Sequence, residues 1–386
     1  MIDKPETIIG IDASNIRQGG GITHLSQLLA HADPKKSNFD KVIVWSNNNT
    51  LDQIPLKPWL VKGTHALLEG NLLYRTLWQI FFLKKSLKRS QCDLLFIPGG
   101  AYTLRFKPTI TMNQNLLPFE YSEIARYKFS LMTVKLIILR FIQKYSFIKA
   151  DAIIFLSRYS KRIVEQSLPK NNSKTMIIPH GIEKKFFQKP KKQSSIKSYT
   201  TENPFRIIYV SSVEFYKHQW NVVEAVYRII ESGYPVEIDF YGAGNKKAIK
   251  KLRKAISRFD KSNKYIRYNS EQNYTQIQNI YFSADLSIFS SSCETFGQIL
   301  LESMAAGLPI ACSDRSAMPE ILLDSGVYFN PLEIDDIEKS LNKLISSVDL
   351  RQELSEKAYQ NAQDYSWDDT SLKTFKFFRS VIDQHE

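Results

Sequence analysis

The chain has 386 residues, 43% of them hydrophobic and 24% charged, and a formal net charge of +13. This composition is typical of a folded soluble protein and excludes a disordered chain, and the length predicts two α/β domains rather than one core. No run of about 20 apolar residues is free of charged or polar interruptions, which excludes a transmembrane helix. The start, "MIDKPETIIGIDAS", lacks the basic and then apolar run of a signal peptide.

Three cysteines, Cys92, Cys293 and Cys312, are too few and too scattered for a disulfide framework or a metal site. Together with the N-terminal sequence, this cysteine usage predicts a cytoplasmic protein.

The positive charge lies in the first half of the chain. Residues 1–180 carry 25 Lys or Arg against 12 Asp or Glu, whereas residues 181–386 carry 27 of each kind. Such asymmetry indicates an anionic partner for the first half: a membrane surface, a nucleic acid or a phosphate-bearing substrate. A basic face that simply meets solvent is the alternative.

Short apolar runs alternate with longer amphipathic stretches along the chain, which predicts two doubly wound parallel sheets. Expected strands in the first half cover 7–13, 41–45, 93–98, 108–112, 151–157 and 175–179. Those in the second half cover 205–212, 236–242, 264–268, 284–291 and 308–313. Ligands of such sheets bind at the carboxyl ends of the strands, so we expect one ligand in a cleft between the domains.

The stretch between the two series of strands, residues 183–204, is polar and basic without an apolar period, as expected of a linker. The sequence therefore predicts an N-terminal domain over 1–182 and a C-terminal domain over 205–368. A final helix, about 369–386, is expected to pack back on the first domain.

Two helical segments of the first domain, 71–90 and 128–149, combine aromatic and aliphatic residues with basic ones. Helices of this composition can lie at an anionic membrane interface. They can equally be buried domain helices whose lysines extend to the surface.

The most informative segment is "SSSCETFGQILLESMAAGLPI", residues 290–310, in which a strand is followed by a helix. Thr295 and Gln298 have the spacing of a capping box, which predicts a helix that begins at Phe296. Glu294 then precedes the helix, and Glu302 lies roughly 7 to 8 Å along it at ~1.5 Å per residue.

This arrangement suits a nucleotide-sugar laid along the helix. Glu294 would accept hydroxyl protons of the sugar, and Glu302 would accept those of the ribose. Free amides and the helix dipole form a seat for phosphate at a helix N-terminus. The residues expected to hold the phosphates are Gly297, Gln298, Ile299 and Leu300.

With its two glutamates eight positions apart and the wording "FGQILLESMAAGLPI", the segment resembles the retaining glycosyltransferases of family 4. The resemblance extends over most of the chain. It implies the GT-B fold, in which two Rossmann-like domains face each other across a cleft.

The resemblance also implies further donor-binding residues. In "GIDASNIRQGGGITHLSQLLA" a glycine loop follows a strand, and Gly20 and Gly21 match the residues that close over the donor phosphates. In "YVSSVEFYKHQWNVVEA" Lys217 matches the lysine that binds the pyrophosphate. Ser212 stands where an arginine is usual, so its hydroxyl, His218 or Arg17 would have to compensate.

A second departure from the family pattern lies in "TMNQNLLPFE", where Gln114 and Asn115 replace the usual His-Asn or His-Asp on the acceptor side. In "PHGIE", which resembles the turn that opens the interdomain hinge, His180 is expected to shape a turn rather than transfer protons.

For the mechanism, the resemblance implies retention of configuration, with Glu294 and Lys217 as the catalytic residues. We expect same-face attack, in which the acceptor hydroxyl gives its proton to the departing phosphate. An Asp-x-Asp loop is missing from the sequence, so neither a metal nor a cofactor is expected beyond the UDP- or GDP-sugar substrate.

The expected acceptor is a glycan or a lipid-linked sugar of cell-surface polysaccharide or lipopolysaccharide synthesis, reached at the inner face of the cytoplasmic membrane. Two alternatives remain open. One is a nucleotide-sugar epimerase of the same fold, and the other is a basic nucleic-acid-binding protein, for which the sequence has no recognised motif.

Overall fold

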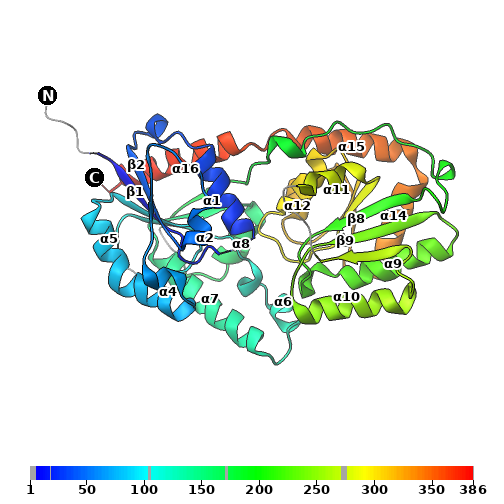
Figure 1. Cartoon of the computed structure of the whole chain (residues 1–386), viewed down its shortest axis with the longest axis horizontal. Coiled ribbons are helices and arrows are strands. Elements are labelled where there is room, and N and C mark those ends of the chain that lie inside the picture. The colour runs from blue at the N-terminus through cyan, green and yellow to red at the C-terminus, as the bar shows by residue number, and fades with distance from the viewer. Residues whose placement is uncertain (1–5, 18, 103–105, 170–172, 271–275, 386) are drawn as a thin grey trace. The chain divides into compact units, whose positions relative to one another are not determined.

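The chain forms two compact units in the computed structural model (Figure 1), which describes residues 6–17, 19–102, 106–169, 173–270 and 276–385. The first unit comprises Met1–Tyr121, Phe129–Gly181 and Ser366–Glu386. The second comprises Ser122–Lys128 and Ile182–Tyr365.

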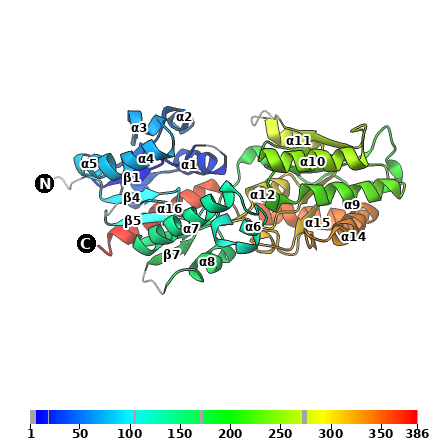
Figure 2. The same ribbon diagram turned by 90° about the horizontal axis from the view of Figure 1, so that it is seen from below.

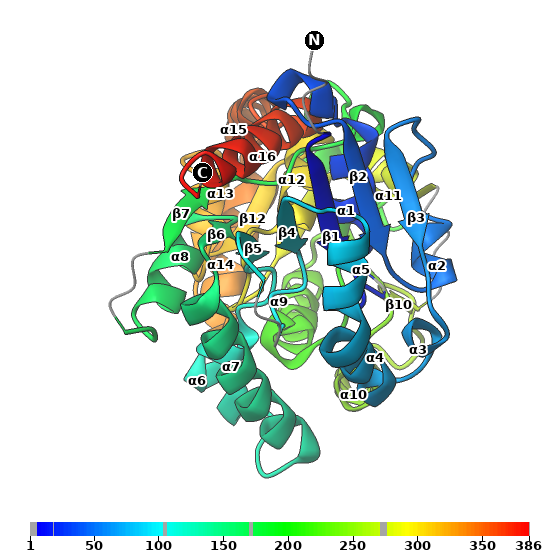
Figure 3. The ribbon, with the colours of Figure 1, turned by 90° about the vertical axis from the view of Figure 1, so that its left-hand side faces the viewer.

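The first unit is built on a seven-stranded parallel sheet of order β3-β2-β1-β4-β5-β6-β7, which can be followed across Figure 3. Its strands are β1 Ile8–Asp12, β2 Lys41–Trp45, β3 Leu60–Gly63, β4 Leu94–Ile97, β5 Thr109–Met112, β6 Ala152–Phe155 and β7 Lys174–Ile177. The central strands are almost wholly buried, because helices cover both faces of the sheet. Figure 2 shows α1, α4 and α5 on one side of β1, β4 and β5, and α7 and α8 on the other.

The helices of the first unit are α1 Gly20–Ala30, α2 Asn48–Leu51, α3 Ala66–Glu69, α4 Leu72–Trp78, α5 Lys84–Arg89, α7 Leu131–Lys149, α8 Arg158–Glu165 and α16 Trp367–Ile382. A π-helical turn, η2 Gln79–Leu83, joins α4 to α5, and 3-10 turns lie at η1 Pro34–Ser37 and η3 Leu117–Phe119. The short helix α6, Tyr121–Ala125, begins at the boundary between the units.

The second unit has a six-stranded parallel sheet of order β10-β9-β8-β11-β12-β13. Its strands are β8 Phe205–Val210, β9 Val236–Tyr241, β10 Ile266–Asn269, β11 Leu286–Phe289, β12 Ile310–Ser313 and β13 Val327–Phe329. Its helices are α9 Gln219–Glu231, α10 Lys246–Phe259, α11 Ile277–Ser283, α12 Gln298–Ala305, α13 Met318–Leu322, α14 Ile334–Ser346 and α15 Val348–Ala362, with 3-10 turns η4 Lys184–Phe186, η5 Ile196–Ser198 and η6 Phe215–Lys217.

The order in which strands are added to the second sheet reverses at β8: β9 and β10 lie on one side of it, and β11, its parallel neighbour on the other side, comes next in sequence. Loops that leave the carboxyl ends of two such strands diverge and form a crevice for ligands. The loops 211–218 and 290–297 therefore leave the sheet side by side at this point.

The two doubly wound sheets agree with the sequence prediction, and every expected strand is present: β2 has the expected bounds, β7 and β10 are shifted by one or two residues, and the others are shorter than expected. The sequence analysis missed β3 and β13, which lie at the edges of their sheets. Both are short, and their segments, "LVKG" and "VYF", contain too few apolar residues to stand out as buried runs.

The unit boundaries differ from the expected ones in two places. Residues 183–204, interpreted as a linker, pack within the second unit, where the buried Arg351 donates to the Ser194 carbonyl at 2.5 Å and to Gln193 Oε1 at 3.1 Å. Residues 122–128 group with the second unit although the neighbouring chain belongs to the first. The final helix, α16, groups with the first unit and contacts α1.

Candidate active site

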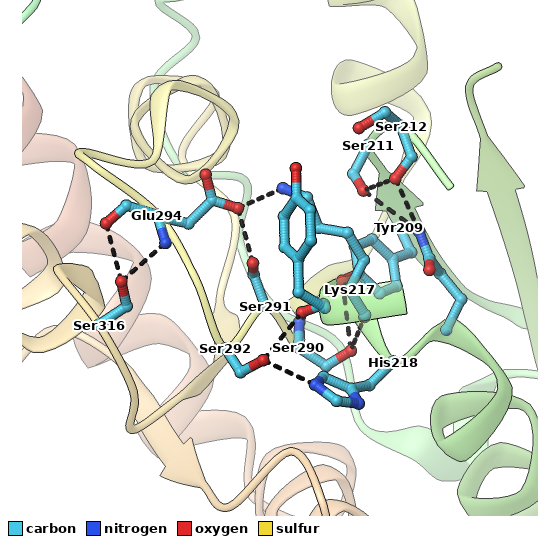
Figure 4. A network of polar contacts seen from close by, with 12 residues as sticks. Tyr209, Ser211, Ser212, Lys217, His218, Ser290, Ser291, Ser292, Glu294 and Ser316 are labelled. Carbon is cyan, nitrogen blue, oxygen red and sulfur yellow. Dashed lines mark hydrogen bonds and ion pairs between the residues drawn. The ribbon is translucent and has the colours of Figure 1, made fainter. Parts of the chain in front are cut away.

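The two residues expected to carry catalysis, Lys217 and Glu294, form an ion pair in the second unit (Figure 4). Lys217 ends the turn η6 after β8, and Glu294 lies in the loop after β11. The side chain of Lys217 is only 4% exposed, whereas that of Glu294 is 18% exposed. The carboxylate is thus the part of the pair that solvent reaches more easily.

The backbones of the two loops are fixed to each other below this ion pair. The Tyr209 hydroxyl donates to the Lys217 carbonyl at 2.6 Å and accepts from the Ser290 amide at 3.2 Å. Ser290 Oγ donates to the same carbonyl at 2.7 Å, and the Ser292 amide donates to the Tyr216 carbonyl at 2.8 Å. Because Tyr209 and Ser290 are buried, this network holds the pair in one geometry.

Glu294 is positioned from two further sides (Figure 4). Ser291 Oγ donates to the same carboxylate oxygen as Lys217, at 2.6 Å. Ser316 Oγ accepts from the Glu294 amide and donates to its carbonyl, both at 2.7 Å. Ser316 has a φ of 62°, an uncommon conformation for a residue with a side chain, and these two bonds help to stabilise it.

Aromatic rings lie next to the side-chain nitrogen of Lys217. Its Nζ lies 4.7 Å from the centroid of the Phe289 ring and 5.4 Å from that of Tyr216. A buried cation of this kind needs an anionic partner, and Glu294 supplies it. Chemically, the pair offers a fixed cation for a phosphate and a carboxylate able to accept hydrogen bonds from hydroxyl groups.

The helix after Glu294 begins two residues later than predicted. The N-cap of α12 is Gly297, with a φ of 102°, so Thr295 is not the capping residue. A side chain at Gly297 would be strained, and its Cβ would lie 2.6 Å from the Met318 methyl carbon. The amide of Leu300 donates to the Gly297 carbonyl at 2.9 Å, which restricts the predicted phosphate seat to residues 297–299, including Gln298 and Ile299.

Glu302 lies well inside α12, as predicted, but its side chain is buried. Its Oε2 accepts a hydrogen bond from the Tyr281 hydroxyl of α11 at 2.9 Å. Burial raises the pKa of Glu302 to about 7. The ribose contact expected of this carboxylate stays a prediction, and the observed partner is a tyrosine of its own unit.

The position where the family pattern has an arginine is an exposed serine. Ser212 presents its backbone carbonyl to Gln219 Nε2, at 3.0 Å, inside the loop. His218 cannot supply the missing charge, because burial lowers its pKa to about 3 and its Nε2 lies 2.8 Å from Ser292 Oγ. Arg126 and Lys251 are the cations that influence His218, and the sequence analysis did not single out either.

In the first unit, the structure brings the glycine loop next to Gln114. A Cβ added to Gly21 would lie 3.5 Å from Gln114 Oε1, whereas one added to Gly20 would meet no atom within 4 Å. Asn115 has a local role, since its Oδ1 accepts from the Leu117 amide at 3.1 Å. The acceptor-side role expected of Asn115 stays a prediction.

Arg17, another proposed source of compensating charge, forms hydrogen bonds within the first unit. It donates to the carbonyls of Leu68 and Gly70. A carboxylate that sequence reasoning missed lies nearby: Asp12 ends β1, is buried, accepts from Gln79 Nε2 at 2.6 Å, and has its pKa raised by burial. An aspartate at the end of an otherwise apolar strand was the available signal.

The part of the chain that the structure describes contains no group of three or more His, Cys, Asp or Glu residues arranged to hold a metal ion. Within the same residues, no helix is both long and apolar enough to cross a membrane. The three cysteines are free and buried.

Comparison with known proteins agrees with this fold. Residues 190–361, a little under half of the chain, match the family described as glycosyl transferases group 1. An uncharacterized glycosyltransferase of Haemophilus influenzae is 24% identical over 92% of this chain and 96% of its own length. The O-antigen chain mannosyltransferase B of Escherichia coli is 24% identical over 115 residues, and this match spans only 30% of each protein.

Solved structures resemble the whole chain at low sequence identity. Sucrose-phosphate synthase from Thermosynechococcus elongatus has a TM-score of 0.77 at 14% identity, covering 98% of this chain and 100% of that one. WaaG, a glycosyltransferase involved in lipopolysaccharide biosynthesis, has a TM-score of 0.69 at 14% identity, covering 96% and 99%. HepE of Anabaena, in complex with UDP and glucose, has a TM-score of 0.70 at 16% identity, covering 97% and 100%.

The solved structures show that the chain has the GT-B fold, and residues 190–361 are similar to glycosyl transferases group 1. The group 1 segment lies within the second unit, which also holds Lys217 and Glu294.

Proposed function

We propose that the protein is a retaining, family 4 glycosyltransferase that transfers a sugar from a UDP- or GDP-sugar to a glycan or lipid-linked acceptor. The observation that supports this most strongly is the fixed ion pair of Lys217 and Glu294 at the switch point of the second sheet. The UDP and glucose bound by the similar HepE structure are consistent with such a donor.

In the proposed reaction, Lys217 binds the donor diphosphate and stabilises the charge that grows on it as the glycosidic bond breaks. Glu294 accepts hydrogen bonds from the sugar hydroxyls and orients the sugar. The acceptor oxygen attacks from the face that the diphosphate leaves, and the acceptor proton passes to a phosphate oxygen. The configuration of the anomeric carbon is thereby retained.

The donor site extends along the start of α12. Amides at residues 297–299 would bind phosphate oxygens. Glu302 would accept hydrogen bonds from the ribose hydroxyls after its present hydrogen bond from the Tyr281 hydroxyl is broken. In the first unit, Gly20, Gly21 and Gln114 are proposed to contact the donor phosphates and the sugars. Ser212 leaves the diphosphate with one fewer cation than the family pattern provides.

We further propose that transfer needs no metal ion, since charge on the leaving group is balanced by Lys217 and backbone amides. Activity should then survive an excess of chelator. A loss of activity that magnesium or manganese restores would contradict this part of the proposal.

The acceptor is proposed to belong to cell-surface polysaccharide or lipopolysaccharide synthesis, with the protein acting in the cytoplasm. Relatives such as the E. coli O-antigen mannosyltransferase are consistent with this class. The relatives named above are glycosyltransferases, so the epimerase alternative gains no support from them.

A thermal-shift screen against UDP, GDP, ADP and their sugars tests the donor. Binding to the folded state raises the melting temperature by mass action, so the preferred nucleotide should stand out. Glu302→Ala should weaken the binding of that nucleotide by roughly 1.5 to 3 kcal/mol if the carboxylate binds the ribose. A chain that none of these ligands stabilises would overturn the proposal.

A further inference from the structure

The exposed apolar side chains of the protein are concentrated on two helical segments of the first unit. On α4 and η2 these are Leu72, Leu73, Tyr74, Ile80, Phe81 and Phe82, and on α7 they include Leu131, Val134, Ile138, Phe141, Tyr145 and Ile148. We call the two sets together the apolar face. Both segments lie along the lower edge of the first unit in Figures 1 and 3.

The residues of α7 follow each other at intervals of three and four, so they form one continuous stripe along the helix. The helix has 19 residues, which corresponds to a stripe about 28 Å long at ~1.5 Å per residue. Leu131 is 90% exposed and Phe141 is 67% exposed. Soluble domains rarely leave so many large apolar side chains together in water unless they meet a partner there.

The opposite side of α7, which packs on the unit, is unusually polar. Its buried residues include Arg140, Gln143 and Ser146. Arg140 donates to the Pro118 carbonyl at 3.0 Å, and Ser146 Oγ accepts from the Tyr102 amide at 3.0 Å. These bonds fix the rotation of the helix, so its apolar stripe cannot turn inward. The interpretation of the two segments as ordinary buried helices with surface lysines therefore fails for α7.

The charge of this surface indicates what covers it. Residues 70–90 and 129–150 contain nine Lys or Arg and no Asp or Glu. Lys84, Lys85, Lys88 and Arg89 are exposed at the end of the first segment, and Lys135 and Lys149 are exposed on α7. A second copy of the chain would bring like charges together, whereas an anionic surface would be attracted.

We infer that the apolar face docks on a lipid bilayer that contains acidic lipids. Helices with an apolar stripe and flanking basic residues lie in the plane of such a surface, with the stripe in the acyl boundary and the ammonium groups among the phosphates. The site would bring the proposed transferase to an acceptor held at the membrane. It concerns the partner of the proposed enzyme, but vesicle binding needs neither donor nor acceptor, so the two proposals can fail separately.

The test is co-sedimentation of the purified full-length chain with phosphatidylcholine vesicles, with and without phosphatidylglycerol. We expect binding to the acidic vesicles at low salt, weaker binding as salt rises, and little binding to neutral vesicles. Phe141→Glu and Phe81→Glu should each reduce partitioning by about tenfold or more, since each removes the burial of a large apolar side chain. Leu56→Glu, at an exposed leucine of the same unit away from both segments, should bind as the wild type does.

The basic residues are tested by a matched pair of fourfold variants. Neutralising Lys84, Lys85, Lys88 and Arg89 to glutamine should reduce binding to acidic vesicles by about tenfold or more. The same change at Lys246, Lys247, Lys250 and Lys254, exposed lysines of α10 in the second unit, should have little effect. Circular dichroism and thermal unfolding establish that each variant is folded.

Three results would overturn the inference. The first is that the folded Phe141→Glu and Phe81→Glu variants bind acidic vesicles as strongly as the wild type does. The second is that both fourfold variants lose vesicle binding equally, which would show that the total charge of the protein, and not the apolar face, determines binding. The third is a wild-type dimer that Phe141→Glu converts to a monomer without a change in vesicle binding, which would assign the face to a second copy.

Discussion

Lys217 and Glu294, 77 residues apart in sequence, form an ion pair. Ser291 donates a hydrogen bond to the carboxylate, and the Phe289 ring lies against the ammonium group. In the proposed reaction Lys217 must bind the donor diphosphate, for which the carboxylate of Glu294 is a competitor. Donor binding would therefore exchange one anionic partner of Lys217 for another, and would free Glu294 for the sugar hydroxyls.

The first prediction follows from this exchange. Glu294→Gln should lower the rate of transfer by about a hundredfold or more, because it removes the charge that the proposed sugar contact needs. The affinity for free UDP or GDP should not fall, since Lys217 loses its competitor. Calorimetric titration of the diphosphate and steady-state kinetics measure the two quantities, and a parallel loss of both would remove Glu294 from the sugar.

A second prediction concerns the leaving group. Lys217→Ala should reduce kcat by a larger factor than it weakens donor binding, because charge on the diphosphate grows as the bond breaks. Lys264→Ala, at an exposed lysine of the same unit, serves as the control and should behave as the wild type does. If Lys217→Ala raised only KM, the lysine would bind the donor without stabilising the leaving group.

Much of the fold could be predicted because the buried strands are read directly as apolar runs. The edge strands β3 and β13 were not predicted, because half-exposed strands lack such apolar runs. The segment 183–204 was misjudged for a related reason: its packing depends on Arg351, a distant residue whose buried position no local pattern reveals.

The candidate site was predicted in its residues but not in its geometry. Spacing and resemblance indicated Lys217 and Glu294, yet their direct contact depends on the neighbouring positions of β8 and β11 in the sheet. The sequence analysis placed the start of α12 two residues too early, because it took Thr295 as the N-cap from its capping-box spacing. In the structure the N-cap is Gly297, whose left-handed backbone conformation ends the preceding loop. Ser316 was missed because it acts through the backbone of Glu294 from another loop.

The buried carboxyl of Glu302 predicts how stability depends on pH. Its pKa is raised to about 7 from an ordinary value of 4.5, so the folded chain binds more protons than the unfolded chain between these values. The free energy of unfolding contributed by this group therefore falls as pH rises from about 4.5 to about 7. Glu302→Gln, which can still accept from Tyr281, should remove that dependence. Denaturant unfolding across this range compares the two proteins, and identical pH profiles would show that Glu302 titrates normally.

His218 predicts the opposite slope at lower pH. Its pKa is lowered to about 3 by burial, so its neutral form stabilises the fold above its ordinary pKa of 6.5, and this contribution is lost as pH falls from there toward 3. Asparagine tolerates the left-handed backbone of this position, where φ is 50°. His218→Asn should thus lose less stability than the wild type on acidification, and its affinity for nucleoside diphosphate at pH 7 should be unchanged. A marked loss of diphosphate affinity would restore His218 as a phosphate ligand.

The most direct test of a retaining nucleotide-sugar transferase needs no knowledge of the acceptor, because water can replace it slowly. The protein is incubated with UDP- and GDP-sugars while proton NMR follows the anomeric signals. We predict release of the nucleoside diphosphate together with a free sugar that first appears in the configuration of the donor, and loss of this activity in Glu294→Gln. An inverted sugar would contradict retention, and an isomerised nucleotide-sugar formed without release of the diphosphate would contradict glycosyl transfer itself.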